Sequence, residues 1–201
     1  KAFDKSSWSH LANGPVGKGW AVCMPSYTLA PNARLSDITH QIGAAITHAA
    51  EHVSGPIHLT GHSAGGHLVT RMISNTSPLP PAVLARVKNT VSISGLHDLR
   101  PLLNTSMNDV LGLNATEAHA ESAALLAPAL PCSITCWVGA DDRPEFVRQN
   151  DLLANIWTGL GASTRAVHAP DKHHFDVIAD LADTDSDLTA CLLSPITAED
   201  V

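Results

Sequence analysis

Apolar and polar positions follow two kinds of pattern along the chain. Short apolar runs closed by Gly or Pro are typical of buried strands, whereas apolar residues spaced three and four apart are typical of helices with one buried face. The helical pattern is clearest over residues 35–53, for which Ser36 is the expected N-cap. The patterns predict strands at residues 19–27, 57–61, 89–94, 133–142 and 164–170, and helices at residues 35–53, 64–74, 144–157 and 174–182.

The alternation of strands and helices predicts an α/β fold. A strand that returns to the same sheet through a helix gives a mostly parallel sheet with helices on both faces. Residues 98–130 contain short helical pieces and no strand, which favours a small helical lid. The whole chain, residues 1–201, can build one sizeable core, so we expect a single domain.

Charge and composition narrow the classes of function. The net charge is −7 and the 12 Lys and Arg residues are scattered, so we expect neither nucleic acid nor a membrane as a partner. No apolar run reaches the roughly 18 residues of a membrane span, and the first residues lack the layout of a signal peptide. We therefore expect a soluble, cytoplasmic protein. The four cysteines are too few and too irregularly spaced for a disulfide framework.

The 12 histidines raise the question of a metal site. His58, His62 and His67 fall on a predicted strand, turn and helix and would point apart, and neither HExxH nor CxxC occurs. We expect no metal at these residues.

A serine lies between two glycines where the strand at 57–61 meets the next helix. The segment Gly61-His62-Ser63-Ala64-Gly65 has the form GxSxG, in which the glycines let the backbone turn sharply and expose the serine hydroxyl. The helix that follows directs its positive end at an oxyanion, with the Ala64 N–H as one donor. Ser63 is therefore a candidate nucleophile, and a helix N-cap is the alternative interpretation.

A serine nucleophile needs a base and an acid that orients the base. On a sheet of this kind the expected chain order is Ser, then Asp or Glu, then His. Asp142 and His174 follow Ser63 in that order, each in a loop between a strand and a helix. The spacing alone leaves Asp141 open as the acid and His173 as the base.

Several segments together resemble the arylformamidase (kynurenine formamidase) group of α/β-hydrolases, near the hormone-sensitive-lipase-like esterases. The matching segments are "GWAVCMPSYTLAP", "ITHQIGAA", "LTGHSAGGHL", "SGLHDLRPLLNTSMND", "VGADDRPEFVRQ" and "KHHFDVI". The resemblance implies an α/β-hydrolase fold, with Asp142 as the acid and His174 as the base. It also implies Asn108 as a candidate pocket residue. Tyr27, at the carboxyl edge of the predicted sheet, and His62, in the serine turn, are further candidates, with a structural role as the alternative for Tyr27.

The family carries an HGG motif that completes the oxyanion hole. The resemblance places it just before a stretch like "AFDKSSWSHLA", and no HGG occurs among the 201 residues. We therefore expect an N-terminally truncated α/β-hydrolase domain. Two alternatives stay open: the intact protein carries the first strands and the HGG motif upstream of Lys1, or it lacks them and with them most of its oxyanion hole.

The resemblance implies a serine hydrolase that uses no cofactor. The expected substrate is a small formamide such as N-formylkynurenine, cleaved to formate and kynurenine. A short-chain carboxylesterase and a non-catalytic binding protein on the same fold are the alternatives. A homodimer is a possible assembly.

Overall fold

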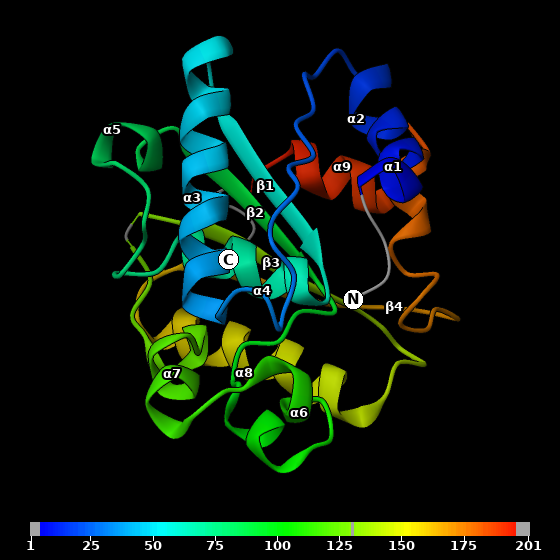
Figure 1. Ribbon diagram of the computed structural model, residues 1–201. Helices are drawn as coiled ribbons and strands as arrows, with labels where there is room; N and C mark the ends of the chain where they lie inside the picture. Colours follow the sequence, from blue (N-terminus) through cyan, green and yellow to red (C-terminus); the bar gives the residue numbers. More distant parts are fainter. Residues whose placement is uncertain (1–4, 130, 196–201) are drawn as a thin grey trace.

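Four parallel strands form the centre of the computed structural model, which describes residues 5–129 and 131–195 (Figure 1). All three pairs are parallel, as the alternation of elements predicts, and the strands lie in chain order, β1-β2-β3-β4. Their bounds are β1 (Ile57–His62), β2 (Val87–Ile93), β3 (Ser133–Gly139) and β4 (Ser163–Ala169). Thr60 aligns with Val91, and Val91 with Thr135, so the carboxyl ends of the strands meet at one edge.

Helices cover both faces of this sheet (Figure 1). Three longer helices lie on one face, and the first and last helices lie on the other. The helices are α1 (Lys5–Trp8), α2 (Asn13–Gly17), α3 (Leu35–His52), α4 (Ala64–Met72), α5 (Pro81–Leu84), α6 (Asn108–Leu111), α7 (Ala115–Ala120), α8 (Pro144–Gly159) and α9 (Asp187–Leu193). The 3-10 turns are η1 (Ser9–Ala12), η2 (Arg100–Asn104), η3 (Ala123–Leu125) and η4 (Ala179–Ala182).

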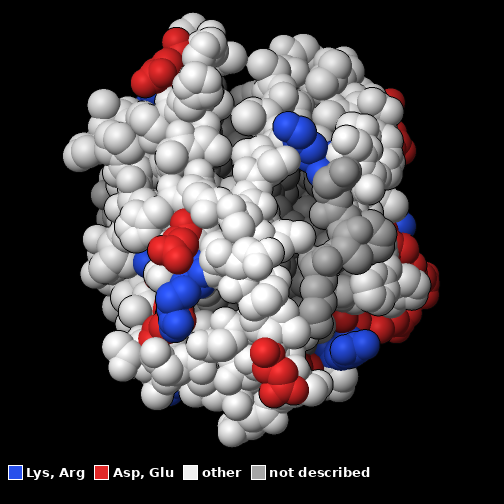
Figure 2. All heavy atoms as spheres, viewed as in Figure 1, with Lys and Arg blue, Asp and Glu red and all other residues white. Residues whose placement is uncertain are grey.

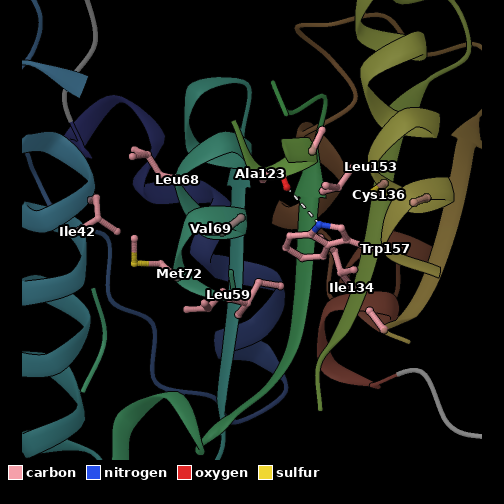
Figure 3. Packing of buried hydrophobic residues seen from close by; sticks show 14 of the residues in the cluster. Ile42, Leu59, Leu68, Val69, Met72, Ala123, Ile134, Cys136, Leu153 and Trp157 are labelled. Atoms are coloured by element: carbon pink, nitrogen blue, oxygen red, sulfur yellow. Dashed lines mark hydrogen bonds between the residues drawn. The ribbon is translucent and has the colours of Figure 1, made fainter. Parts of the chain in front are cut away.

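The larger core lies between the sheet and helices α3, α4 and α8 (Figure 3). Trp157 of α8 is fully buried there, and its indole N–H donates to the carbonyls of Ala123 and Leu126 at 3.2 and 3.0 Å. Because the indole N–H is hydrogen-bonded, burying the ring leaves no unpaired donor in the core. These bonds tie the segment around η3 to α8.

A second core fills the opposite face. Val91 and Ile93 of β2 and Trp137 of β3 meet Leu188 and Leu192 of α9 there. Because alternate strand residues point to opposite faces, a buried strand supplies apolar side chains to both cores.

Residues 19–27 do not form the predicted strand, since Gly19 lies in a turn and residues 20–27 belong to no regular element. None of the N–H groups of residues 21–27 donates to a backbone carbonyl among the described residues, and β1 pairs only with β2. Residues 19–27 therefore have the apolar composition of a strand, but no neighbouring strand among the described residues forms backbone hydrogen bonds with them. This segment, α3 and the edge of β1 together enclose a groove of about 210 Å³. Its lining includes Trp20, Val22, Ala49, Val53 and Ile57.

The predicted helix at 174–182 is also wrong, since only η4 is helical there. The last helix, α9, begins at Asp187, where the Ser186 hydroxyl accepts the N–H of Thr189 at 3.1 Å. Ser186 is a regular N-cap signal that marks the true start.

The predicted N-cap of α3 needs a similar correction. The cap is Arg34, whose N–H donates to the Asp37 carboxylate at 3.2 Å. Ser36 lies inside the helix, and its N–H and hydroxyl bind Glu117. No helix in the described part of the chain is both long and apolar enough to cross a membrane.

Candidate active site

Ser63 occupies a sharp turn between β1 and α4. Its φ of 55° and ψ of −112° are unusual for a residue with a side chain, and its N–H donates to the Ile93 carbonyl at 2.8 Å. A Cβ at Gly61 would lie 2.3 Å from the Gly65 carbonyl oxygen, so the turn requires glycine there. A Cβ at Gly65 would meet open space, so the second glycine of the motif is not required sterically.

Three side chains from separate loops meet at this turn. His174 Nε2 lies 3.2 Å from Ser63 Oγ, and His174 Nδ1 lies 3.0 Å from Asp142 Oδ2. The Asp142 side chain is fully buried and that of His174 is 15% exposed. The candidate nucleophile, base and acid thus form one hydrogen-bonded path at the carboxyl edge of the sheet.

The carboxylate of Asp142 is held by two further donors. The Ser94 hydroxyl donates to Oδ2 at 2.8 Å, and the Arg143 N–H donates to Oδ1 at 2.7 Å. Ser94 directly follows β2, is fully buried and has a φ of 44°. Its N–H donates to the Trp137 carbonyl. A carboxylate fixed by several donors has a defined direction in which to receive the imidazole N–H.

His174 is held by its neighbours as well. His62 Nε2 lies 2.7 Å from the His174 carbonyl oxygen, and the two rings are 4.7 Å apart. Burial, with the nearby His174, lowers the pKa of His62 to about 4. His62 is therefore neutral at pH 7 and donates its Nε2–H to the His174 carbonyl. This candidate pocket residue thus helps to hold His174 in position.

Two phenylalanines flank the same imidazole. The ring of Phe146, in the first turn of α8, lies 4.1 Å from that of His174, and Phe175 makes an edge contact at 5.2 Å. Phe175 is 69% exposed. The sequence reasoning missed both rings, although their positions beside Asp142 and His174 in the chain are a usable signal.

The structure separates the neighbouring residues that the spacing left open. Asp141 is exposed, and its N–H binds the Lys172 carbonyl. His173 is exposed and lies 3.3 Å from Asp176. Asp142 and His174 are the members of each pair that join the path to Ser63.

The other candidate pocket residues are engaged elsewhere. Tyr27 packs against the larger core, where burial raises the pKa of its phenol. The amide of Asn108 binds both the N–H and the carbonyl of Leu113. Asn108 therefore ties the loop after α6, and its side chain has no contact with the triad among the described hydrogen bonds.

The three histidines considered for a metal each have different surroundings. His58 Nδ1 lies 2.8 Å from the Leu192 carbonyl oxygen, His62 contacts His174, and His67 is buried in α4. The four cysteines are free thiols.

Two buried histidines lie beneath the turn. His67 of α4 is 2% exposed and His97 is fully buried. Burial lowers the pKa of His67 to about 4 and, with the nearby His67, that of His97 to about 3. Both are neutral in the folded protein at pH 7.

The buried histidines should make the protein sensitive to acid. Histidine in the unfolded chain takes up a proton near pH 6.5, whereas His67 in the folded protein does so only near pH 4. The stability that is present above pH 6.5 is therefore lost as the pH falls from 6.5 towards 4. We expect the free energy of unfolding to fall by about 2 kcal/mol at pH 5 on account of His67 alone. Urea unfolding at pH 7.5 and pH 5.0 measures it. His67→Gln should reduce the difference between the two pH values and exposed His40→Gln should not; equal effects would contradict the assignment.

Comparison with known proteins places this chain in a family. No family model matches the chain. Kynurenine formamidase of Salmo salar is 32% identical over 200 residues, which cover 95% of this chain and 67% of that protein. Kynurenine formamidase of Danio rerio is 29% identical over 202 residues, covering 96% and 68%. The chain thus spans about two thirds of the length of these relatives.

Solved structures agree on the fold. A crystal structure provisionally assigned as a thioesterase, from Silicibacter sp. tm1040, is 51% identical, with a TM-score of 0.91 over 96% of this chain and 71% of that chain. The apo form of esterase 2 from Thermogutta terrifontis is 18% identical, with a TM-score of 0.58 over 81% of this chain and 64% of that chain. The second likeness bears on the fold alone. The chain has an α/β-hydrolase fold and belongs to the kynurenine formamidase family.

Proposed function

We propose that this protein is a serine hydrolase that cleaves a small aryl formamide such as N-formylkynurenine to formate and kynurenine. The observation that carries the proposal is the hydrogen-bonded path from Ser63 through His174 to Asp142. The curated relatives named kynurenine formamidase support the substrate class.

The first half of the reaction forms a formyl-enzyme. His174 Nε2 takes the proton of the Ser63 hydroxyl while Oγ attacks the formyl carbon. The oxyanion that develops lies at the start of α4, where the Ala64 N–H has no acceptor within its own helix. Asp142 orients the imidazole and stabilises the imidazolium. The tetrahedral intermediate then collapses, the C–N bond breaks, and His174 gives its proton to the departing arylamine.

The second half releases formate. A water molecule enters in place of the amine, and His174 removes its proton as the oxygen attacks the formyl ester. When the second tetrahedral intermediate collapses, the bond to Ser63 Oγ breaks and His174 returns the proton to the serine. Formic acid leaves and ionises to formate in water, and the enzyme regains its starting protonation.

The surroundings of His174 favour an aromatic leaving group. Phe146 lies against the imidazole and Phe175 is exposed beside it. An aniline ring released next to these side chains could stack on them, which an alkyl alcohol could not do.

Two measurements test the proposal. A fluorophosphonate probe should label one residue per chain, and Ser63→Ala should abolish the labelling, because only an activated serine reacts. The value of kcat/KM for N-formylkynurenine should exceed that for p-nitrophenyl butyrate by at least about tenfold. Faster cleavage of the ester would make the protein a short-chain carboxylesterase. Absence of both labelling and hydrolysis would leave a binding protein on the same fold.

A further inference from the structure

Two histidines and a glutamate share one face at the end of α3. The sequence His48-Ala49-Ala50-Glu51-His52 places the three polar side chains at positions i, i+3 and i+4, which are neighbours on a helix surface. All three are exposed, and Figure 2 shows acidic atoms protruding at the upper end of this helix. The cluster belongs to neither the candidate active site nor the cores.

The spacing of the three groups suits a single metal ion. One ring nitrogen of each histidine and one oxygen of Glu51 all lie within 4.8 Å of one another. Ligands held 2.0–2.1 Å from a tetrahedral ion are about 3.4 Å apart, so a movement of little more than 1 Å would bring them into place. The side chains of His48 and Glu51 are 74% and 68% exposed, so rotation about their own bonds is free to make that adjustment.

A backbone hydrogen bond already orients one of the ligands. His52 Nδ1 lies 2.9 Å from the His48 carbonyl oxygen, which requires the proton on Nδ1 and leaves the lone pair of Nε2 for an ion. Histidines that bind metals usually donate their other ring N–H in this way. The carboxyl end of a helix also carries partial negative charge, which favours a bound cation.

We propose that His48, Glu51 and His52 form a binding site for a divalent transition-metal ion such as Zn²⁺, with water completing its coordination. Two imidazoles and one carboxylate favour Zn²⁺ or Cu²⁺ over Mg²⁺ and Ca²⁺, which prefer all-oxygen sites. The ion would cross-link the last two turns of α3.

The position of the site gives it a structural consequence. Arg86 donates to the carbonyls of Ala50 and Val53 at the same end of α3. Ala49 and Val53 line the groove beside β1. An ion bound by His48 and His52 would restrain the last turns of α3, which carry both the Arg86 hydrogen bonds and the groove-lining residues.

Zn²⁺ titration of the full chain at pH 7.5 by isothermal calorimetry tests the proposal. We expect one site, and a loss of affinity of at least about tenfold in His48→Ala and in His52→Ala. His40→Ala is the matched control. His40 lies on the same helix, is exposed, and bonds the carbonyl four residues before it at 2.8 Å. Its own i+3 and i+4 positions are Gly43 and Ala44, so it has no partner there for chelation.

Cu²⁺ provides a second readout that does not depend on folding stability. The electron paramagnetic resonance spectrum of the Cu²⁺-loaded chain should show two coordinated imidazole nitrogens, reduced to one in His52→Ala. Equal loss of affinity in His40→Ala and His48→Ala, or unchanged binding in all three variants, would overturn the proposal.

Discussion

Replacing Asp142 by Asn should lower kcat for formamide hydrolysis about 10⁴-fold. Asp142 Oδ2 accepts hydrogen bonds from both Ser94 and His174 in the folded protein. An amide has the same shape, but it would donate to Nδ1 or lose the bond, and either outcome leaves the imidazole in the wrong tautomer and its positive charge without a counter-ion. Steady-state rates at saturating N-formylkynurenine measure the loss.

Asp141→Asn is the matched control for this variant. Asp141 is the adjacent residue with the same chemistry, but its side chain is exposed. We expect its kcat to stay within about twofold of the unchanged protein, because an exposed charge at the start of a loop is screened. Equal losses in the two variants would contradict the assigned acid, and circular dichroism with urea unfolding would show whether either variant has lost its fold.

The sequence predicts the four paired strands and the site they support because those signals are local. β1, β2, β3 and β4 all fall within a few residues of segments predicted from apolar or β-branched residues that are closed by Gly or Pro. One further rule, that parallel strands bring their carboxyl ends to one edge, predicts that Ser63 meets one residue of the pair Asp141 and Asp142 and one of the pair His173 and His174. Only the family resemblance selects Asp142 and His174 within these pairs. The contacts of Ser63 and Asp142 with His174 follow from that arrangement.

Features that depend on partners distant in the chain could not be predicted in this way. Residues 19–27 have the composition of a strand, but strand formation also needs a neighbour with free N–H and carbonyl groups, which no local pattern reports. Ser94 is similar, since nothing in "SISG" reveals a bond to a carboxylate 48 residues later. The stacking of Phe146 on His174 likewise joins two separate loops.

The buried ion pair beneath the candidate active site joins three elements. Arg71 of α4 donates from Nε to Glu121 Oε2 at 3.0 Å, and Thr39 of α3 donates to the same oxygen at 2.7 Å. The side chains of Arg71 and Glu121 are 5% and 7% exposed. Burial would raise the pKa of Glu121, but the hydrogen bonds from Arg71 and Thr39 outweigh it and lower that pKa. The pair is therefore charged at neutral pH and holds α4, the helix that begins directly after Ser63.

Glu121→Gln should lower the free energy of unfolding by about 3–5 kcal/mol, because it leaves the Arg71 guanidinium buried without a counter-ion. Urea unfolding at pH 7.5 measures this loss. The exposed pair of Lys18 and Asp185, which are 2.9 Å apart, is the control, and Asp185→Asn should cost less than about 1 kcal/mol. Replacing both partners, Arg71→Met with Glu121→Leu, should recover much of the stability, since no unpaired charge then remains. If Glu121→Gln were as mild as Asp185→Asn, the pair would not be what secures α4 beneath Ser63.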